Sequence, residues 1–241
     1  MIDLNTLIKD INKISIDAGE AILTVYNAVG DIEISKKGDD SPLTKADSAA
    51  NKVICDALEK LEVVYPILSE ENREIPYAER KDFDRFWVVD PLDGTKEFIK
   101  KNGEFTVNIA LVEAGQPILG VVYTPVTGEL FYAVKGSGAF MEVAGKTKKI
   151  NVHNFSKGDE GLRLVCSRSH LNEATQNFVD QLNAPARVPK GSSLKFLILA
   201  QGGAHLYPRL APTMEWDTGA AHIVLEEAGG KVINVETDQP L

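Results

Sequence analysis

Cysteine is scarce in this 241-residue sequence, which contains two, Cys55 and Cys166. Two cysteines that lie far apart in the chain make neither a disulfide framework nor a zinc site. We therefore interpret both as reduced thiols, which behave as small apolar side chains and tend to be buried. A fold held together by disulfides is excluded.

Long apolar runs are also missing from the sequence. None approaches the roughly 20 residues that a helix needs to span a bilayer. Residues 1–20 contain acids and lack the apolar core of a signal peptide. We therefore expect a cytoplasmic protein without a transmembrane segment.

Positive charge is in deficit, because 26 Lys and Arg residues stand against 35 Asp and Glu residues, for a net charge of −9. Nucleic-acid polymers and anionic membranes bind clustered positive charge, so the balance argues against both as partners. It does not exclude a small phosphorylated substrate, because a local set of cations or a metal ion can bind phosphate inside an acidic protein. The hydrophobic share of 44% is ordinary for a globular protein.

The first two thirds of the chain predict two helices followed by strands. Apolar residues at helical spacing predict an amphipathic helix over 4–25 and a second helix over 45–61, with Thr44 as its N-cap. Apolar stretches between turn residues predict strands over 31–35, 63–69, 86–90, 105–113, 117–123, 129–134 and 138–143. The segments 36–42 and 72–84 are expected to be loops. The last four strands should form an antiparallel meander.

The pattern changes after residue 152. The predicted strands are then 162–167, 186–189, 204–207 and 232–233, and the predicted helices are 172–182, 192–201 and 217–228. Alternating strands and helices predict a smaller α/β part. We therefore expect one unit over residues 1–241, made of an α+β subdomain over 1–150 and an α/β subdomain over 151–241.

Four acids stand where a predicted strand ends or a predicted helix begins, and these are Glu70, Asp90, Asp93 and Asp217. Such positions collect functional groups, because a rigid element presents the side chain at an edge. In Asp90-Pro91-Leu92-Asp93-Gly94-Thr95, the proline fixes one φ angle and the glycine allows a backbone conformation that other residues resist. The two aspartates, and the carbonyl of the leucine between them, can then face one point.

Carboxylate and carbonyl oxygens are hard ligands that suit Mg²⁺, which keeps several waters and substrate phosphate oxygens. Sulfur is absent from the acidic motifs and no histidine falls within them, which argues against zinc. Converging carboxylates also repel one another unless a cation lies among them. Each motif has a plainer interpretation when it stands alone, as a turn, a solvated acidic pair or a helix cap. The longer strings around the acids decide between the two.

Those longer strings resemble the signatures of the inositol monophosphatase superfamily. The first signature is matched by Trp87-Val88-Val89-Asp90-Pro91-Leu92-Asp93-Gly94-Thr95-Lys96-Glu97-Phe98, and the second by Trp216-Asp217-Thr218-Gly219-Ala220-Ala221 through Gly229-Gly230. Two further family motifs are matched in order by Leu43-Thr44-Lys45-Ala46-Asp47 and Leu68-Ser69-Glu70-Glu71. The resemblance covers nearly the whole chain. It implies a layered sugar-phosphatase fold with alternating α and β layers, in which 1–150 binds metal and 151–241 binds substrate.

The resemblance also implies the roles of individual residues. It implies two or three Mg²⁺ ions, inhibition by Li⁺, and as metal ligands Glu70, Asp90, the Leu92 carbonyl, Asp93 and Asp217. The catalytic set includes Glu70, the Thr95 hydroxyl that orients the attacking water, and Asp47 as the partner of that threonine. Metal ions would neutralise charge on the phosphoryl group during in-line displacement. The Gly94 and Thr95 amides, at the start of a short helix, are expected to bind phosphate oxygens.

The second half of the chain suggests which substrate is bound. Its hydroxyl and cationic side chains resemble the nucleotide contacts of 3'(2'),5'-bisphosphate nucleotidases, and they are His170, Ser192, Lys195 and Arg209. The full set expected to contact substrate adds Glu70, Leu92, Asp93, Gly94, Thr95 and Asp217. The expected reaction converts adenosine 3',5'-bisphosphate and water into AMP and phosphate, with 3'-phosphoadenylyl sulfate as a second substrate. A role in sulfate assimilation follows by family analogy.

Two alternatives stay open from the sequence. One is a phosphatase of the same scaffold acting on inositol monophosphate or a sugar bisphosphate. Ser192-Ser193-Leu194-Lys195 argues against it, since inositol monophosphatases resemble Gly-Ser-Ala-Ala there. The other is a catalytically silent regulator that binds metal or nucleotide. The protein is expected to be a monomer or a homodimer, and peripheral association with the inner membrane face is implied only by analogy.

The sequence departs from the family pattern at two places. Gly219 stands where the second signature usually has Ala, and a glycine inside a helix costs roughly 1 kcal/mol relative to alanine. The chain ends at Leu241, where relatives usually continue for a short segment and a strand. We therefore expect the pairing of the last strand to be incomplete.

Overall fold

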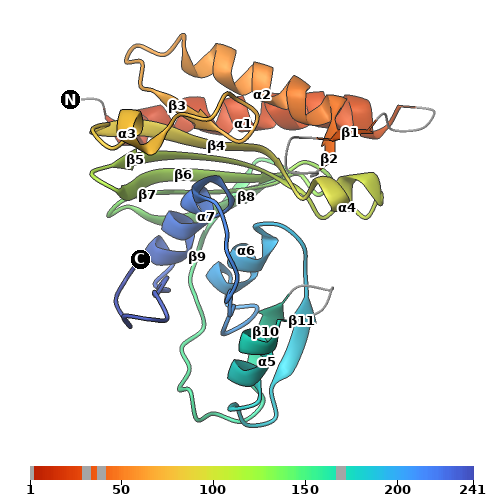
Figure 1. The fold of residues 1–241 in the computed structure, drawn as a ribbon, viewed down its shortest axis with the longest axis vertical. Helices are drawn as coiled ribbons and strands as arrows, with labels where there is room; N and C mark the ends of the chain where they lie inside the picture. Colours follow the sequence, from red (N-terminus) through yellow and green to blue (C-terminus); the bar gives the residue numbers. More distant parts are fainter. Residues whose placement is uncertain (1–2, 29–33, 37–41, 167–171) are drawn as a thin grey trace.

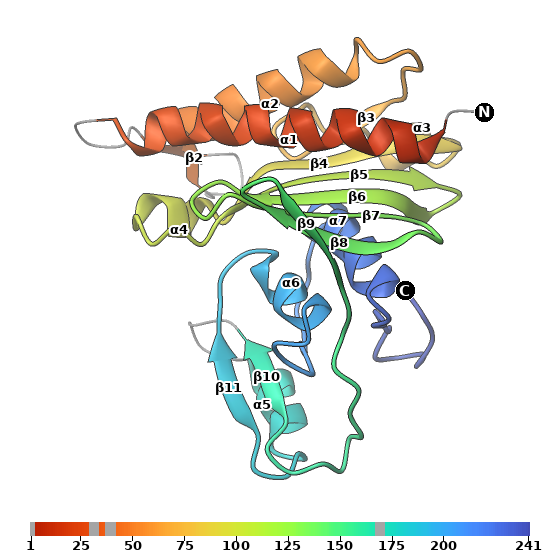
Figure 2. The ribbon, with the colours of Figure 1, turned by 180° about the vertical axis from the view of Figure 1, so that it is seen from behind.

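The protein is built in layers, as a computed structural model shows for residues 3–28, 34–36, 42–166 and 172–241. Two long helices cover one face of a twisted sheet, and further helices cover the other face (Figures 1 and 2). A small unit of two strands and one helix lies beyond those helices, at the far end from the N-terminus.

The helices are α1 Leu4–Tyr26, α2 Lys45–Leu58, α3 Tyr77–Arg80, α4 Thr95–Ile99, α5 Glu173–Val179, α6 Leu194–Ala200 and α7 Glu215–Glu227. The strands are β1 Ile34–Lys36, β2 Pro42–Thr44, β3 Ile67–Ser69, β4 Arg85–Asp93, β5 Thr106–Glu113, β6 Gln116–Thr124, β7 Glu129–Val134, β8 Gly138–Val143, β9 Lys146–Ile150, β10 Arg163–Cys166 and β11 Ala186–Pro189. Within the described ranges, none of these helices is long and apolar enough to cross a membrane.

Seven strands form the large sheet in the order β3-β4-β5-β6-β7-β8-β9. Strands β3 and β4 are parallel, and every later pair is antiparallel, so the predicted meander is confirmed. The prediction missed β9, because its sequence Lys-Thr-Lys-Lys-Ile has a single buried residue. Such a charged strand is typical of a sheet edge, where lysines discourage pairing with another chain.

Helices α1 and α2 cover one face of the sheet through a large hydrophobic cluster. Ile11 and Ile22 of α1 and Ile54 of α2 are fully buried there with Trp87 and Ile109 of the sheet. The predicted N-cap of α2 is confirmed, because the Thr44 side chain accepts a hydrogen bond from the Ala46 amide. The burial of one apolar stripe on each helix explains why sequence periodicity predicted both elements well.

The opposite face of the sheet carries α6 and α7. Val88 and Ala110 of the sheet share a second hydrophobic cluster with Leu197 of α6 and Val224 of α7. Both helices belong to residues 151–241 and yet pack against the sheet of residues 1–150. The division into two subdomains near residue 150 stays a prediction.

A smaller unit contains β10, β11 and α5. The two strands pair in parallel, from Arg163 opposite Ala186 to Cys166 opposite Pro189. Their own small cluster buries Leu164 against Val179 of α5. This unit confirms the predicted change from an antiparallel meander to alternating strands and helices.

Several predicted elements have different limits in the structure. The expected strand 63–69 is confined to β3, and the expected loop 72–84 contains the single turn of α3. The segment 204–207 contributes one isolated bridge, from Leu206 to Leu164, and 232–233 another, from Ile233 to Pro240. Of the expected strand 31–35, residues 31–33 lie outside the described residues. The loop expected over 36–42 overlaps β2, which pairs with β1.

We predict that Gly219→Ala stabilises the protein. The glycine lies inside α7, and a Cβ built there would contact Ala110 at an ordinary 3.5 Å. Alanine should therefore raise the free energy of unfolding by about 0.5–1 kcal/mol, since glycine is the poorer helix former. Thermal unfolding in the absence of ligand measures the effect, as a Tm increase of about 1–4 °C.

A matched control is Gly120→Ala on β6, directly beneath the same helix. A Cβ at that position would lie 2.6 Å from the Ala220 carbonyl oxygen and 2.5 Å from Ile223. Overpacking of this kind costs about 1–3 kcal/mol, so this variant should unfold at a lower temperature. A lower Tm for Gly219→Ala would contradict the packing described for α7.

Candidate active site

The candidate site lies where β3 and β4 end together. The two strands are parallel, and the Glu70 amide donates to the Val89 carbonyl at 3.1 Å. Glu70 follows β3, while Asp90 and Asp93 occupy the last part of β4. Because the two strands are parallel, their carboxyl ends lie side by side at the same end of the sheet. The structure therefore brings these three predicted site residues together.

Strand β4 runs three residues further than the predicted end at Asp90, across an irregularity. Asp90 pairs with Asn108 and Asp93 with Thr106, and the register shifts between the two pairs. Pro91, which has no N–H to donate, falls within this shift, and bulges are where a strand tolerates proline. The Leu92 amide donates to Asp90 Oδ1 at 3.0 Å. The register shift therefore falls between the two aspartates of the motif.

Gly94 ends the motif in the left-handed region, with φ of 101°. A Cβ at this position would lie 2.9 Å from the Glu104 carbonyl oxygen, so the glycine is required both by conformation and by space. The chain then enters α4 at Thr95. The predicted short helix after the motif is confirmed, and the Gly94 and Thr95 amides lie at its start.

Asp90 is the most deeply buried of the predicted ligands, with 2% of its surface exposed. Burial raises the pKa of this carboxyl well above its usual range, and the charges of Asp93, Glu70 and Asp217 raise it further. The Glu70 side chain is close enough to share a hydrogen bond with Asp90. The four acids therefore form one interacting electrostatic cluster.

Asp93 is held on one side by α6. Its Oδ2 accepts the Ser193 hydroxyl at 2.7 Å and the Ser193 amide. Asn108 donates to the same hydroxyl at 2.9 Å. Burial raises the pKa of Asp93, while Lys195 and the Ser193 hydrogen bonds lower it. Both bonds from Ser193 end on the same carboxylate oxygen, Oδ2.

Asp217 lies in the first turn of α7 and takes part in a capping box. Its Oδ2 accepts the Met214 amide at 3.1 Å and the Thr213 hydroxyl at 2.6 Å. The helix cap that the sequence offered as the plainer interpretation is therefore present. It does not exclude a ligand role, because the same carboxylate still acts electrostatically on Asp90.

The donor set fits a hard divalent cation by its chemistry. It consists of carboxylates and one backbone carbonyl, and burial together with mutual repulsion disfavours the charged form of Asp90. A cation among the four acids would reverse that penalty. In the part of the chain that the structure describes, no three His, Cys, Asp or Glu side chains already surround one point. The assignment of the four acids as metal ligands stays a prediction.

Asp47 and Thr95 meet across the site. The Thr95 hydroxyl donates to Asp47 Oδ1 at 3.1 Å and lies 3.4 Å from the Leu92 carbonyl oxygen. Asp47 is 1% exposed, and its Oδ2 accepts the Thr44 amide at 2.8 Å. Capping of α2 therefore fixes the carboxylate that accepts the hydrogen bond from Thr95. The contact predicted between Asp47 and Thr95 is present, while the catalytic role of the pair stays a prediction.

Cations gather on the α6 side of the site. The Lys195 ammonium donates to the Ser192 carbonyl at 2.6 Å and lies 5.4 Å from the centre of the Tyr207 ring. Burial lowers the pKa of Lys195, the charge of Asp93 opposes that change, and the charge of Arg209 adds to it. The structure thus brings together the predicted residues Ser192, Lys195 and Arg209. Of the predicted substrate contacts, His170 lies outside the described residues.

Tyr207 joins this group although the sequence gave no reason to choose it. Burial raises its pKa to about 12, and a hydrogen bond with Arg209 partly opposes the shift. The Tyr207 hydroxyl therefore stays protonated, and its ring lies beside the Lys195 ammonium. Tyr207 lies between Leu206, which bridges to Leu164 of β10, and Pro208.

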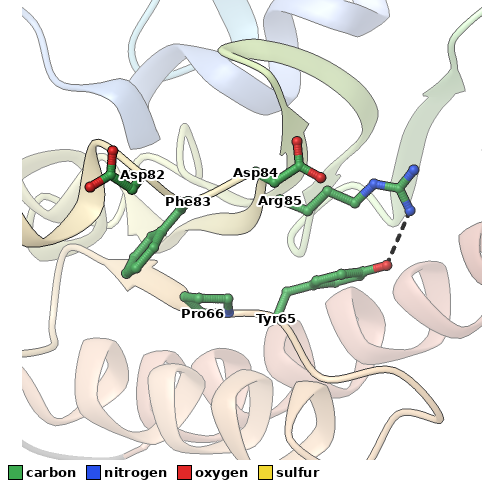
Figure 3. Close-up of a pocket in the computed structure, with 6 residues that line it drawn as sticks. All are labelled: Tyr65, Pro66, Asp82, Phe83, Asp84 and Arg85. Carbon is green, nitrogen blue, oxygen red and sulfur yellow. Dashed lines mark hydrogen bonds between the residues drawn. The ribbon is translucent and has the colours of Figure 1, made fainter.

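A separate surface hollow of about 440 Å³ lies at the opposite end of β4 (Figure 3). It is lined by Tyr65, Pro66, Asp82, Phe83, Asp84 and Arg85. Arg85 points to the Tyr65 hydroxyl at 3.2 Å and also pairs with Glu113. The hollow includes none of the predicted site residues, so the chemistry of the protein is not assigned to it.

Comparison with known proteins identifies the family. The model of the inositol monophosphatase family matches residues 3–240, and the chain belongs to this family. It is 44% identical over 226 residues to the 3'(2'),5'-bisphosphate nucleotidase CysQ of Salmonella typhimurium, covering 94% of this chain and 89% of that protein. It is 46% identical over 216 residues to the CysQ of Escherichia coli strain K12, covering 90% and 85%.

A solved structure agrees with the sequence relatives. The crystal structure of CysQ from Bacteroides thetaiotaomicron, a bacterial member of the inositol monophosphatase family, superposes with a TM-score of 0.80 at 39% identity. The match covers 93% of this chain and 87% of that one. The predicted family and the predicted layered fold are therefore both confirmed.

Proposed function

We propose that this protein is a 3'(2'),5'-bisphosphate nucleotidase that converts adenosine 3',5'-bisphosphate and water into AMP and phosphate. The observation that carries the proposal is the pair of cations, Lys195 and Arg209, beside the acidic cluster that contains Asp93. A substrate with two phosphates needs one site for the reacting group and another for the group that is retained. The names of the CysQ relatives support the same substrate. The sulfated analogue, 3'-phosphoadenylyl sulfate, is a second candidate substrate.

Magnesium ions, two or three by family analogy, would stabilise charge on the phosphoryl group and lower the pKa of a water molecule. Their proposed ligands are Glu70, Asp90, the Leu92 carbonyl, Asp93 and Asp217. Because the Thr95 hydroxyl donates a hydrogen bond to Asp47, its lone pairs are left to accept a hydrogen bond from that water. The pair thereby orients the water, and we assign Glu70 to the same catalytic set.

Lys195 and Arg209 serve the retained phosphate in this proposal. Burial and a neighbouring cation both disfavour the charged form of Lys195 in the free protein. An anion between the two cations would relieve both effects, because opposite charges close together favour ionisation. Ser192, whose carbonyl binds the Lys195 ammonium, would contribute its hydroxyl to the same phosphate. In this proposal, Ser192, Lys195 and Arg209 of the second half of the chain distinguish a bisphosphate from a monophosphate.

Lys195→Ala is expected to raise KM for adenosine 3',5'-bisphosphate by about tenfold or more, since a hydrogen bond to a charged group contributes about 1.5–3 kcal/mol. For adenosine 3'-monophosphate, which lacks the retained phosphate, KM should change little. Steady-state phosphate release on both substrates measures the difference. Equal changes for both substrates would mean that Lys195 does not recognise the second phosphate.

We also propose that the protein is cytoplasmic and that it is a monomer or a homodimer. An inositol monophosphatase or sugar bisphosphatase is the competing assignment on the same scaffold. An inositol monophosphate has no retained phosphate for the two cations beside Ser192 to bind. A sugar bisphosphate would have one, and the names of the CysQ relatives favour a nucleotide over it.

A further inference from the structure

The segment 190–193 connects β11 to α6 and contains Ser192, one turn before Lys195. We call residues 190–193 the substrate segment. This inference rests on our proposed function, which assigns Ser192 and the nearby Lys195 to the retained phosphate. It approaches the metal side of the protein closely. A Cβ on Gly191 would lie 2.9 Å from Glu97 Cγ and 3.4 Å from the Glu104 carbonyl oxygen.

A buried carboxylate holds the beginning of this segment. Glu104 is 7% exposed and lies in the loop between α4 and β5. Its Oε2 accepts the Gly191 amide at 3.0 Å, and its Oε1 accepts the Lys190 ammonium at 3.1 Å. Both oxygens of one rigidly placed carboxylate are therefore directed at two successive residues of the substrate segment.

The substrate segment needs such support because its backbone is strained. Ser192 has φ of 45°, in the left-handed region that an L-residue enters only at an energetic cost. Strained residues persist where their surroundings over-determine them. Here the restraint comes from both sides, with Glu104 bonded to Gly191 before the strained residue and Asp93 bonded to Ser193 after it.

The two restraints act on different halves of the site. Asp93 belongs to the acidic cluster, so changing it also changes that cluster. Glu104 bonds to Gly191 and Lys190, which lie outside the acidic cluster. A change at Glu104 therefore acts first on the beginning of the segment and on Ser192, while the Ser193 bonds still hold its other end to Asp93.

We propose that Glu104 is a positioning residue for recognition of the retained phosphate, which it performs by fixing the substrate segment through Gly191 and Lys190. It does not touch the phosphate. The specificity for a bisphosphate then depends on a residue of the first 150 positions as well as on the cations of the second half.

The test compares Glu104→Gln with the unchanged protein on adenosine 3',5'-bisphosphate and on adenosine 3'-monophosphate, at saturating Mg²⁺. Glutamine keeps the size of the side chain but accepts through one oxygen, so one of the two bonds is lost. KM for the bisphosphate should rise about tenfold, because a charge-assisted bond is lost. Its kcat, the Mg²⁺ concentration for half-activation, and KM for the monophosphate should stay unchanged.

Two further variants keep the test decisive. Lys190→Gln removes the ammonium and leaves the Gly191 bond, so it should produce the same selective rise at about threefold, even if Glu104→Gln fails to fold. Glu113→Gln is the matched control, because it removes a carboxylate paired with Arg85 at the far end of β4 and should alter neither KM.

The outcomes separate the inference from the proposed function. A selective rise of KM for the bisphosphate supports the positioning role. Unchanged KM in both folded variants, or a parallel loss on both substrates, overturns it while leaving the nucleotidase assignment intact. If the unchanged protein shows no preference for the bisphosphate over the monophosphate, the proposed function fails, and this inference fails with it.

Discussion

Asp93→Asn is expected to lower kcat by roughly 1,000-fold or more. Metal assistance contributes several kcal/mol, and each change of about 1.36 kcal/mol in the barrier changes the rate tenfold. Asparagine retains an oxygen that can accept the bonds from Ser193, so the tie to α6 survives. What it removes is the charge with which Asp93 would hold a cation. The measurement is phosphate release as a function of Mg²⁺ concentration.

A second readout for this variant does not depend on turnover. An ion that binds only the folded state raises the Tm of the unchanged protein as its concentration increases. Asp93→Asn should show a much smaller increase, although the protein without metal should be at least as stable, since one buried and repelled charge is gone. Asp82→Asn, an exposed acid at the other end of β4, is the control and should behave like the unchanged protein. A folded Asp93→Asn protein with nearly normal activity would refute the metal assignment.

Thr95→Val is expected to reduce kcat by about 100-fold or more with a small change in KM, which is the usual contribution of a positioned proton-transfer group. Valine keeps the shape of threonine and removes the hydroxyl that donates to Asp47. The water would then lose the acceptor that orients it, while substrate binding keeps its contacts. Single-turnover phosphate release separates this loss from any change in binding.

Thr95→Ser is the matched control, since serine restores the hydroxyl and should recover most of the rate. Asp47→Asn is a less specific test, because Asp47 Oδ2 also caps α2 through the Thr44 amide and hydroxyl. That variant should lower both kcat and the Tm. Equal activity of the valine and serine variants would show that the Thr95 hydroxyl has no part in the reaction.

Local sequence information was sufficient for most of the fold and for the acidic motifs. The apolar stripes of α1 and α2 follow helical spacing, and the motif from Asp90 to Thr95 combines a proline and a glycine in fixed places. Gly94 illustrates the strength of the signal, because its left-handed φ and its contact with the Glu104 carbonyl leave no room for another residue.

Contacts between distant parts of the chain were not predictable in the same way. Ser193 meets Asp93 from 100 positions away, and Glu104 meets Gly191 from 87 positions away. The sequence around Ser193 or Glu104 does not show that its side chain meets a residue so far away in the chain. Edge strand β9 was missed for a related reason, since its lysines face solvent and produce no apolar alternation. Tertiary packing decided these features, and propensity alone did not.

The most direct test of the account is a phosphate-release panel at saturating Mg²⁺, with and without Li⁺. It compares adenosine 3',5'-bisphosphate with inositol 1-phosphate and fructose 1,6-bisphosphate. The account predicts a large kcat/KM preference for the adenosine bisphosphate, dependence on Mg²⁺ and inhibition by Li⁺. A preference for inositol 1-phosphate would contradict the roles given to Lys195 and Arg209, and release no faster than the blank would mean that the protein is a silent binder.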